Sequence, residues 1–267
     1  MPEDLRCRLN LILRKMNNDN TGKFDGYAGD YTVGRPNYAA GLIDLMYDAY
    51  GMSCSSSIAD IGSGTGKFAV HMLSKGSTVY CVEPNDDMRL TAEKELGNYP
   101  NFHSVKGDAE HFGLGPDSVD FITTAQAFHW FDADRFRNEC SRVLKDNGKV
   151  FLVWNVRDMS SEINQELYKI YERYCPDFVG FSGGIKKDDR RIRLFFNDKY
   201  EYVSFDNPLF MDKDKFIARS LSGSYSIKEG DRNYDEYMKK IDDIFERYSR
   251  KGKVMIANRS VAYIGTV

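Results

Sequence analysis

The sequence has no excess of one charge sign and no cysteine pattern typical of a metal site. Its 37 Lys and Arg residues are balanced by 40 Asp and Glu residues, which gives a formal net charge of -3. A general nucleic-acid-binding protein normally carries a clear basic excess, so we predict no nucleic-acid partner. The five cysteines form no Cys-x-x-Cys pair and no Cys/His cluster, which predicts free thiols, a cytoplasmic location and no bound metal ion.

Long apolar runs are missing as well. Residues 1–20 mix basic and apolar side chains, and their apolar run is too short for a signal peptide or a membrane span. We therefore expect residues 1–30 to form a leader or a short amphipathic helix, and we expect no membrane partner. A chain of 267 residues is long enough to bury a full hydrophobic core without disulfides. The sequence does not determine an oligomeric state.

Short apolar runs alternate with helical patterns from Ser57 onward, which predicts βαβ units and a parallel sheet. Asn85 and Asp132 are expected helix N-caps, and Asn147-Gly148 marks a tight turn. The expected strands are 58–61, 78–82, 102–105, 119–123 and 149–154, and the expected helices are 66–75, 86–96 and 133–144.

After residue 155 the pattern changes. Apolar residues at helical spacing predict a helix that ends near Tyr174, and a Gly- and charge-rich stretch at 180–191 predicts a loop. The remaining elements are expected at 200–205 (strand), 216–221 and 234–248 (helices) and 254–264 (one long β segment).

A glycine-rich turn follows the first expected strand, in the order Asp60, Gly62, Gly64 and Gly66. Glycines there allow a sharp turn and a close approach of a ligand to the backbone, and the next helix offers free N–H groups. The spacing does not fit a P-loop, because that motif requires a glycine where Ile61 stands. A dinucleotide-binding turn requires its third glycine one position later than Gly66.

Two acidic residues follow the next two strands. Glu83 ends the second strand, where a carboxylate can accept both hydroxyls of a ribose, as in NAD-binding proteins; a helix-capping or solvated glutamate is the alternative. Asp108 lies in a Gly-Asp-Ala-Glu segment after the third strand, for which a plain acidic loop is the alternative.

The ordered Asp-x-Gly-x-Gly-x-Gly turn, Glu83 and Asp108 resemble the motifs of class I S-adenosylmethionine-dependent methyltransferases. Segments 31–38, 125–131 and 144–149 extend the resemblance to the small-molecule branch that includes trans-aconitate methyltransferase. It implies an α/β, Rossmann-like fold: a seven-stranded, mostly parallel sheet with helices on both faces, an antiparallel C-terminal strand and helical cover segments. Residues 31–155 would form the cofactor-binding core, and residues 156–267 would supply the acceptor-covering helices and the last strands.

The resemblance also implies the cofactor, S-adenosyl-L-methionine, with S-adenosyl-L-homocysteine as the product. Asp108 and Ala109 would contact the adenine and Glu83 the ribose, and Arg35 would pair with the methionyl carboxylate or with an acidic acceptor. The implied cofactor-binding residues are Tyr31, Arg35, Asp60, Gly62, Ser63, Gly64, Glu83, Pro84, Met88, Asp108, Ala109, Glu110 and Gln126.

The acceptor site is expected around the end of the fourth strand. His129 is the candidate general base, with a packing role beside Trp130 as an equal alternative, and Trp130 is a candidate wall of the acceptor pocket. Arg219 and Tyr225 are expected to cover this pocket. His71, His103 and His111 are expected to be surface or loop residues.

The motifs that are missing narrow the acceptor. Residues 125–128 replace the Asn/Asp-Pro-Pro-Tyr/Phe motif of enzymes that methylate amide or adenine nitrogens, and no Pro-Cys nucleophile is present. With the balanced charge, these absences favour a small-molecule acceptor. Two other functions stay open: a non-catalytic S-adenosylmethionine-binding protein and a nicotinamide-dependent oxidoreductase.

Overall fold

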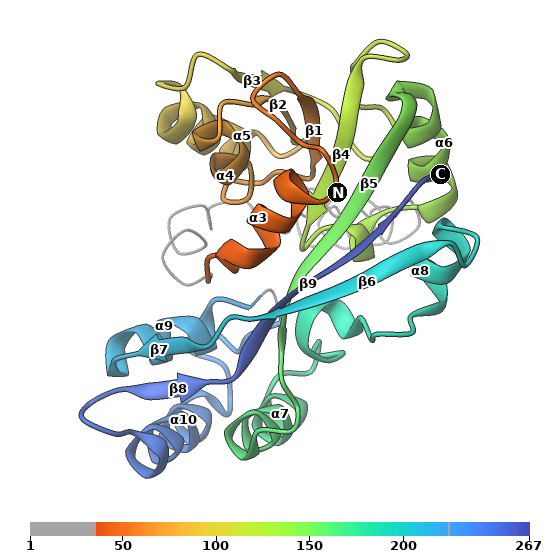
Figure 1. The fold of residues 1–267 in the computed structure, drawn as a ribbon. Helices are drawn as coiled ribbons and strands as arrows, with labels where there is room; N and C mark the ends of the chain where they lie inside the picture. The colour runs from red at the N-terminus through yellow and green to blue at the C-terminus, as the bar shows by residue number, and fades with distance from the viewer. Residues whose placement is uncertain (1–35, 224) are drawn as a thin grey trace, which may run out of the picture.

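The computed structural model describes residues 36–223 and 225–267, so the predictions for residues 1–30, Tyr31 and Arg35 lie outside the described residues. Within the described part, seven strands form one sheet in the order β3-β2-β1-β4-β5-β9-β6 (Figure 1). These strands are β1 (Ser57–Ile61), β2 (Thr78–Val82), β3 (Phe102–Val105), β4 (Val119–Ala125), β5 (Leu144–Arg157), β6 (Tyr200–Asp206) and β9 (Asn258–Gly265).

The pairing confirms the predicted fold class. Strands β1 to β5 pair in parallel, whereas β9 runs antiparallel to both β5 and β6. The sheet order reverses between β1 and β4, which is the point where an open α/β sheet forms a ligand crevice at the carboxyl ends of its strands.

Helices cover both faces of the sheet, which explains why its central strands carry apolar residues on both of their faces. One face carries α3 (Ala40–Asp48), α4 (Ala69–Ser74) and α5 (Asp86–Leu96), and the other carries α6 (Ala133–Val143) and α8 (Arg190–Phe195) (Figure 1). Residues 150–154 of β5 are fully buried between these layers.

The predicted N-caps are confirmed at two of these helices. The Asn85 side chain accepts a 3.0 Å hydrogen bond from the backbone N–H of Met88 at the start of α5. The Asp132 carboxylate accepts two 3.1 Å bonds from the first turn of α6. Each cap satisfies N–H groups that have no partner within the helix.

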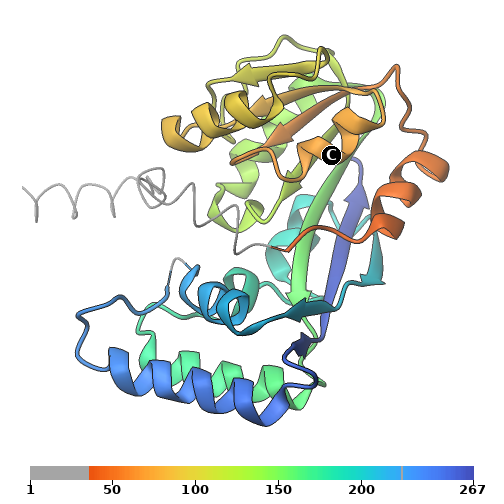
Figure 2. The ribbon, with the colours of Figure 1, turned by 90° about the vertical axis from the view of Figure 1, so that its left-hand side faces the viewer.

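A separate group of elements, which we call the cover subdomain, lies beyond the carboxyl ends of the sheet strands (Figures 1 and 2). It consists of α7 (Glu162–Tyr174), α9 (Lys213–Leu221), α10 (Tyr234–Tyr248) and a two-stranded antiparallel sheet of β7 (Leu209–Met211) and β8 (Val254–Ile256). Figure 2 shows α7 and α10 side by side. Their apolar stripes meet in a buried cluster of their own around Leu167 and Ile241.

The expectation of one β segment at 254–264 is wrong. The segment is divided at Ala257, because β8 pairs with β7 in the cover subdomain and β9 pairs with β5 in the main sheet. Hydrogen bonds from Asp158 N and from Asn164 Nδ2 to the Ala257 carbonyl hold the division point. The predicted loop at 180–191 contains the 3-10 helix η3 (Phe181–Gly184) and the start of α8, which the sequence pattern did not indicate.

The Asn164 side chain joins the two sheets, and its removal should destabilise the fold. It is fully buried, and its Nδ2 donates to the carbonyls of Asp158 (2.8 Å) and Ala257 (2.7 Å). We expect Asn164→Leu to lower the free energy of unfolding by about 1–3 kcal/mol, because both carbonyls lose this donor. The exposed neighbour Gln165 bonds one carbonyl, and Gln165→Ala should change it by less than about 0.5 kcal/mol. Urea unfolding measures both changes in free energy, provided that the slope of the free energy against urea concentration is the same in each variant. Equal effects of the two variants would contradict the role of Asn164 in stabilising the fold.

Candidate active site

A cleft that is open to solvent lies at the carboxyl ends of β1, β4 and β5. This is the edge of the sheet where the strand order reverses and where a ligand crevice is expected. Its walls come from the glycine turn after β1, the ends of β4 and β5, the segment before α3 and one residue of the cover subdomain. The lining residues are Pro36, Tyr38, Asp60, Gly62, Ser63, Gly64, Thr65, Lys67, Phe68, Ala125, Gln126, Asn155 and Arg219.

The glycine turn presents bare backbone to this cleft. Gly62, Gly64 and Gly66 have φ angles of 65°, 57° and 77°, a conformation that other residues adopt only with strain. A Cβ on Gly66 would collide with Leu96, so this glycine lets α5 pack closely. A Cβ on Gly64 would meet no atom within 4 Å. The edge at Gly64 is therefore open for a ligand to lie against the main chain.

Asp60 is buried at the floor of the cleft, and one of its two carboxylate oxygens accepts no hydrogen bond from the described residues. Its Oδ1 accepts a 2.7 Å hydrogen bond from Thr123 Oγ1, and its Oδ2 has no partner among the described residues. The residue is only 1% exposed. Desolvation raises the pKa of this carboxyl to about 7, with a further increase from Glu83 and a partial decrease from the Thr123 bond. A cationic ligand group would satisfy the unpartnered oxygen and favour the ionised form.

Glu83 lies behind the glycine turn and fixes its shape. Its Oε2 accepts from Gly64 N (2.8 Å), and its Oε1 accepts from Asn85 N (2.9 Å). Burial raises the pKa of Glu83, opposed by these two hydrogen bonds and by the charge of Arg89. Because each carboxylate oxygen can accept a second bond, the side chain keeps acceptor capacity.

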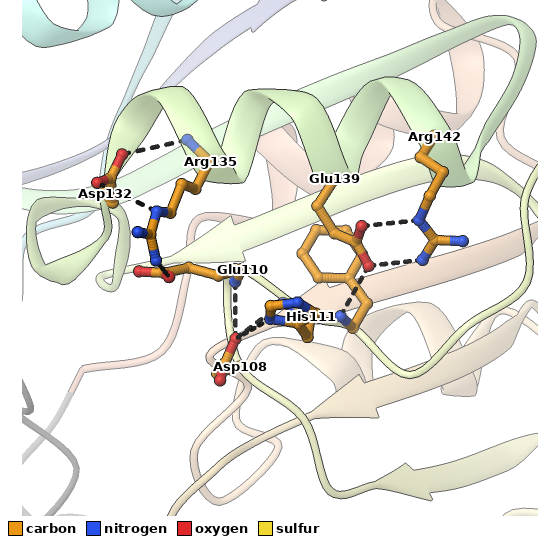
Figure 3. Close-up of polar contacts among 8 residues, drawn as sticks. Asp108, Glu110, His111, Asp132, Arg135, Glu139 and Arg142 are labelled. Carbon is orange, nitrogen blue, oxygen red and sulfur yellow. Dashed lines mark hydrogen bonds and ion pairs between the residues drawn. The ribbon is translucent and has the colours of Figure 1, made fainter.

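The loop after β3 is folded around Asp108 (Figure 3). Asp108 is exposed, and its Oδ1 accepts 2.8 Å bonds from the backbone N–H groups of Glu110 and His111. Glu110 is paired with Arg135 of α6 at 2.6 Å. One turn further along α6, Glu139 accepts from the backbone N–H of Phe112 (3.0 Å) and pairs with Arg142. Helix α6 therefore holds this loop in place.

Gln126 follows β4 in a strained backbone conformation. Its φ is 61°, which is unusual for a residue with a side chain. The conformation is held by Gln126 N, which donates to Val153 O (2.9 Å), and by Nε2, which donates to Asn155 O (3.1 Å). Such strain concentrates at functional sites, and here it places the residue in the wall of the cleft.

Residues 36–39, which we call the strap, form one side of the cleft and are held by an asparagine cluster. Asn155 Nδ2 donates to the carbonyls of Pro36 (3.4 Å) and Asn37 (3.2 Å). Asn207 Nδ2 donates to the Asn37 carbonyl at 2.7 Å. Ser260 Oγ accepts from Ala39 N at 2.9 Å. The ends of β5, β6 and β9 thus fix a segment that is far away in sequence.

The same cluster is joined internally. Asn155 Oδ1 accepts from Ser260 Oγ (2.6 Å) and from Asn207 Nδ2 (3.1 Å). On the opposite side, His71 Nε2 lies 2.6 Å from Asn37 Oδ1, so the strap also contacts α4. His71 was expected to be a surface or loop residue, but it lies half-buried in α4, and burial together with the charge of Lys67 lowers its pKa.

The structure brings together some of the predicted site residues. Asp60, Gly62, Ser63, Gly64, Gln126 and Arg219 line the cleft. Glu83 contacts it through Gly64. The remaining predicted residues are not among those that line it: Pro84, Met88, Asp108, Ala109, Glu110, His129, Trp130 and Tyr225.

The predicted acceptor residues lie in three places. His129 and Trp130 belong to the 3-10 helix η2 (Phe128–Trp130), with ring centroids 4.8 Å apart. Tyr225 packs against Phe178 (4.9 Å) in the aromatic cluster of the cover subdomain. Arg219 extends from α9 into the cleft wall. The roles of His129, Trp130 and Tyr225 stay predictions.

The residues that the sequence did not single out are Thr65, Lys67, Phe68, Ala125 and Asn155. Thr65 and Ala125 lie within the motifs at residues 60–66 and 125–131, and Lys67 and Phe68 directly follow the first motif, so this position in the sequence was the only signal. Asn155 directly follows the apolar run 149–154. A polar residue at the carboxyl end of that expected strand was the only indication that it lines the cleft.

Removal of the Asn207 side chain should release the strap without changing a residue that lines the cleft. We expect Asn207→Ala to speed hydrogen exchange at the Ala39 amide roughly fivefold, which corresponds to about 1 kcal/mol for the lost bonds. Asn98→Ala, at an exposed asparagine far along the chain from the cluster, is the control. Unchanged exchange at Ala39 in Asn207→Ala would show that the cluster does not hold the strap.

No helix among the described residues is both long and apolar enough to cross a membrane. The same residues contain no group of three or more His, Cys, Asp or Glu side chains placed to hold a metal ion.

Comparison with known proteins places this chain among methyltransferases. Residues 59–152 match the model of a methyltransferase domain family. An uncharacterized methyltransferase of Schizosaccharomyces pombe is 33% identical over 193 residues, which is 72% of each chain. A second protein of that organism, described as methyltransferase-like, is 35% identical over 153 residues; the match covers 57% of this chain and spans 59% of the length of that relative.

The fold comparison agrees. A solved structure of a candidate type II methyltransferase from Anaeromyxobacter dehalogenans superposes with a TM-score of 0.64 at 19% identity, covering 87% of this chain and 97% of that one. The match over 72% of a relative, the sheet order with its antiparallel β9 and the glycine turn lead to the same conclusion. The chain belongs to the family of class I S-adenosylmethionine-dependent methyltransferases.

Proposed function

We propose that this protein is an enzyme that transfers a methyl group from S-adenosylmethionine to a small-molecule acceptor and releases S-adenosylhomocysteine. The observation that carries this proposal is the buried Asp60 carboxylate, whose Oδ2 has no hydrogen-bond partner in the described part of the chain and lies in the same cleft as the open edge of Gly64. A ligand with an ammonium group next to a chain that follows the backbone fits this pair of features.

The surrounding residues fit the rest of the cofactor. Lys67 and Arg219 are the cations of the cleft wall and suit the methionyl carboxylate. Glu83 has acceptor capacity for the ribose hydroxyls, and the loop at Asp108 and Ala109, held by α6, would receive the adenine. The Tyr38 ring, which packs edge-on against Phe68 at 4.8 Å, offers an aromatic surface near a sulfonium.

When bound, S-adenosylmethionine supplies a methyl group that is already activated by its positively charged sulfur. The protein then has to align the acceptor in line with the methyl–sulfur bond and to exclude water. The strap and α9 border the cleft and would exclude water from it. His129 would accept a proton only if the acceptor must lose one. The balanced net charge favours a small molecule over a nucleic acid as the acceptor.

Titration with S-adenosylhomocysteine and with NADH tests the cofactor assignment. By calorimetry we expect a dissociation constant in the micromolar range for S-adenosylhomocysteine, which corresponds to a binding free energy of about -8 kcal/mol. We expect no measurable binding of NADH. NADH binding alone would favour the oxidoreductase alternative. Binding of the methyltransferase cofactor without turnover over a broad acceptor panel would favour a non-catalytic binding protein.

Glu83→Gln should weaken S-adenosylhomocysteine binding by at least roughly tenfold, because a carboxylate bond to a ribose hydroxyl is a charge-assisted hydrogen bond worth about 1.5–3 kcal/mol. The amide keeps one acceptor for the glycine turn, so folding should persist. Glu95→Gln, at an exposed acid on the same helix as Met88, is the control. Equal affinities of the Glu83 and Glu95 variants would remove Glu83 from the cofactor site.

Cofactor affinity should increase with pH through the titration of Asp60. Because the pKa of this carboxyl is raised from 3.8 to about 7, most of the unliganded protein has it neutral at pH 6 and ionised at pH 8. An ammonium group prefers the ionised form, so the dissociation constant should fall roughly tenfold between these values. The unliganded protein should instead lose stability as pH rises from about 4 through 7, because the unfolded chain ionises Asp60 first.

Asp60→Asn is the matched control for both pH effects. Any pH dependence that remains in this variant belongs to the ligand or to other groups. An equally steep dependence in Asp60→Asn and in the wild type would contradict the assignment. Calorimetric titrations at pH 6, 7 and 8 measure the affinities.

A further inference from the structure

Arg157 occupies an unusual environment at the end of β5. Its guanidinium carbon lies 4.3 Å from the ring centroid of Phe181 in η3 and 5.8 Å from that of Tyr171 in α7. The residue is half-buried, and its Nη1 is buried without a hydrogen-bond partner among the described residues. Two aromatic rings therefore hold a charged group whose donors are not all used.

No carboxylate within the described residues forms an ion pair with Arg157. The next residue, Asp158, uses its Oδ1 to accept from Ser160 N (2.9 Å) and Ser160 Oγ (2.8 Å). Arginines elsewhere in the structure do pair with acids, for example Arg142 with Glu139 at 2.6 Å. Burial of an uncompensated charge is costly, so an anionic ligand would stabilise this arrangement.

Arg157 lies next to the cofactor cleft, on its cover-subdomain side. Asn155 lines the cleft. Arg157 lies two residues further along the same extended strand, so its Cα is roughly 6.6 Å from that of Asn155 and its side chain leaves the same face of the strand. Helix η3 is fixed at this point, because Ser182 Oγ donates to the Asn155 carbonyl at 2.9 Å while its neighbour Phe181 stacks on Arg157. The guanidinium thus lies at the junction of sheet and cover subdomain.

The cover subdomain connects Arg157 to the wall of the cleft. The ring of Tyr171 stacks on that of Tyr237 at 6.1 Å, and Tyr237 Oη donates to the carbonyl of Ser220 at 2.8 Å. Ser220 is the neighbour of Arg219, which lines the cleft. The residues that hold Arg157 and those that enclose the cofactor are therefore parts of one packed unit.

We propose that Arg157 binds an anionic group, a carboxylate or a phosphate, on the methyl acceptor. This proposal rests on the proposed methyltransferase function and names the chemical class of its acceptor. The rings of Phe181 and Tyr171 orient the guanidinium plane, and its N–H groups donate to the two oxygens of the anion. The methionyl carboxylate would have Lys67 and Arg219 of the cleft wall beside it, which leaves Arg157 for the acceptor.

The test measures anion preference in protein saturated with S-adenosylhomocysteine. The probes are phenylacetate, its neutral analogue phenylacetamide, acetate and inorganic phosphate, titrated by calorimetry at constant ionic strength. We expect wild-type protein to bind phenylacetate at least tenfold more tightly than phenylacetamide. Acetate against phosphate shows which oxyanion the site prefers. Arg157→Gln should abolish the preference and change the affinity for S-adenosylhomocysteine by less than twofold.

Two further variants make the result specific. Arg232→Gln, at an exposed arginine of the segment before α10, should keep the wild-type preference. Arg157→Lys keeps the charge and should retain a reduced preference, and it serves in place of Arg157→Gln if that variant does not fold. The proposal is overturned if wild-type protein binds none of the anions more tightly than phenylacetamide, or if the preference survives in Arg157→Gln. Failure of S-adenosylhomocysteine to bind wild-type protein refutes the proposed function separately, in the first titration.

Discussion

The burial of one carboxylate, that of Asp60, is the constraint on which the site depends. Its Oδ1 accepts a hydrogen bond from Thr123 on the neighbouring strand, and its Oδ2 is held at the floor of the cleft without a partner from residues 36–223 or 225–267. An ionised group in such a place is stable only beside a cation. The bare main chain at Gly64 provides the adjoining surface. Together these features favour a zwitterionic ligand that lies along the backbone, as the methionyl end of the cofactor does.

The second requirement is that segments far apart in the chain enclose the cleft. The single residue Asn155 contacts several of these segments, because its carbonyl accepts hydrogen bonds from Gln126 and Ser182 while its side chain contacts the strap and Ser260. The polar end of β5 thereby joins the strap, the end of β4 and η3. Cofactor enclosure and acceptor binding at Arg157 would then depend on the same strand end.

Much of the fold could be predicted because its signals are local. The alternation of apolar runs and helical patterns gave the parallel strands, and Asn85 and Asp132 gave the helix starts. The break at Ala257 could not be predicted, since the polar residues 258–260 that follow it still belong to strand β9, and the break is caused by hydrogen bonding from Asp158 and Asn164. The position of the strap could not be predicted either, because it depends on a hydrogen bond from Ala39 N to Ser260 Oγ, 221 residues away in the sequence. Within the site, the glycine turn could be predicted because it carries a sequence motif. The roles of Asn155 and Arg157 could not, because they depend on contacts with residues far away in the sequence.

The most direct measurement of the central claim is a crystal structure of the complex with S-adenosylhomocysteine. The account predicts that the amino nitrogen of the ligand lies about 3 Å from Asp60 Oδ2, with its methionyl chain along Gly62 to Gly64 and its ribose hydroxyls at Glu83. The sulfur should face the side of the cleft where Arg219 and the end of β5 meet. A ligand bound elsewhere, or one whose amino group makes no contact with Asp60, would contradict it.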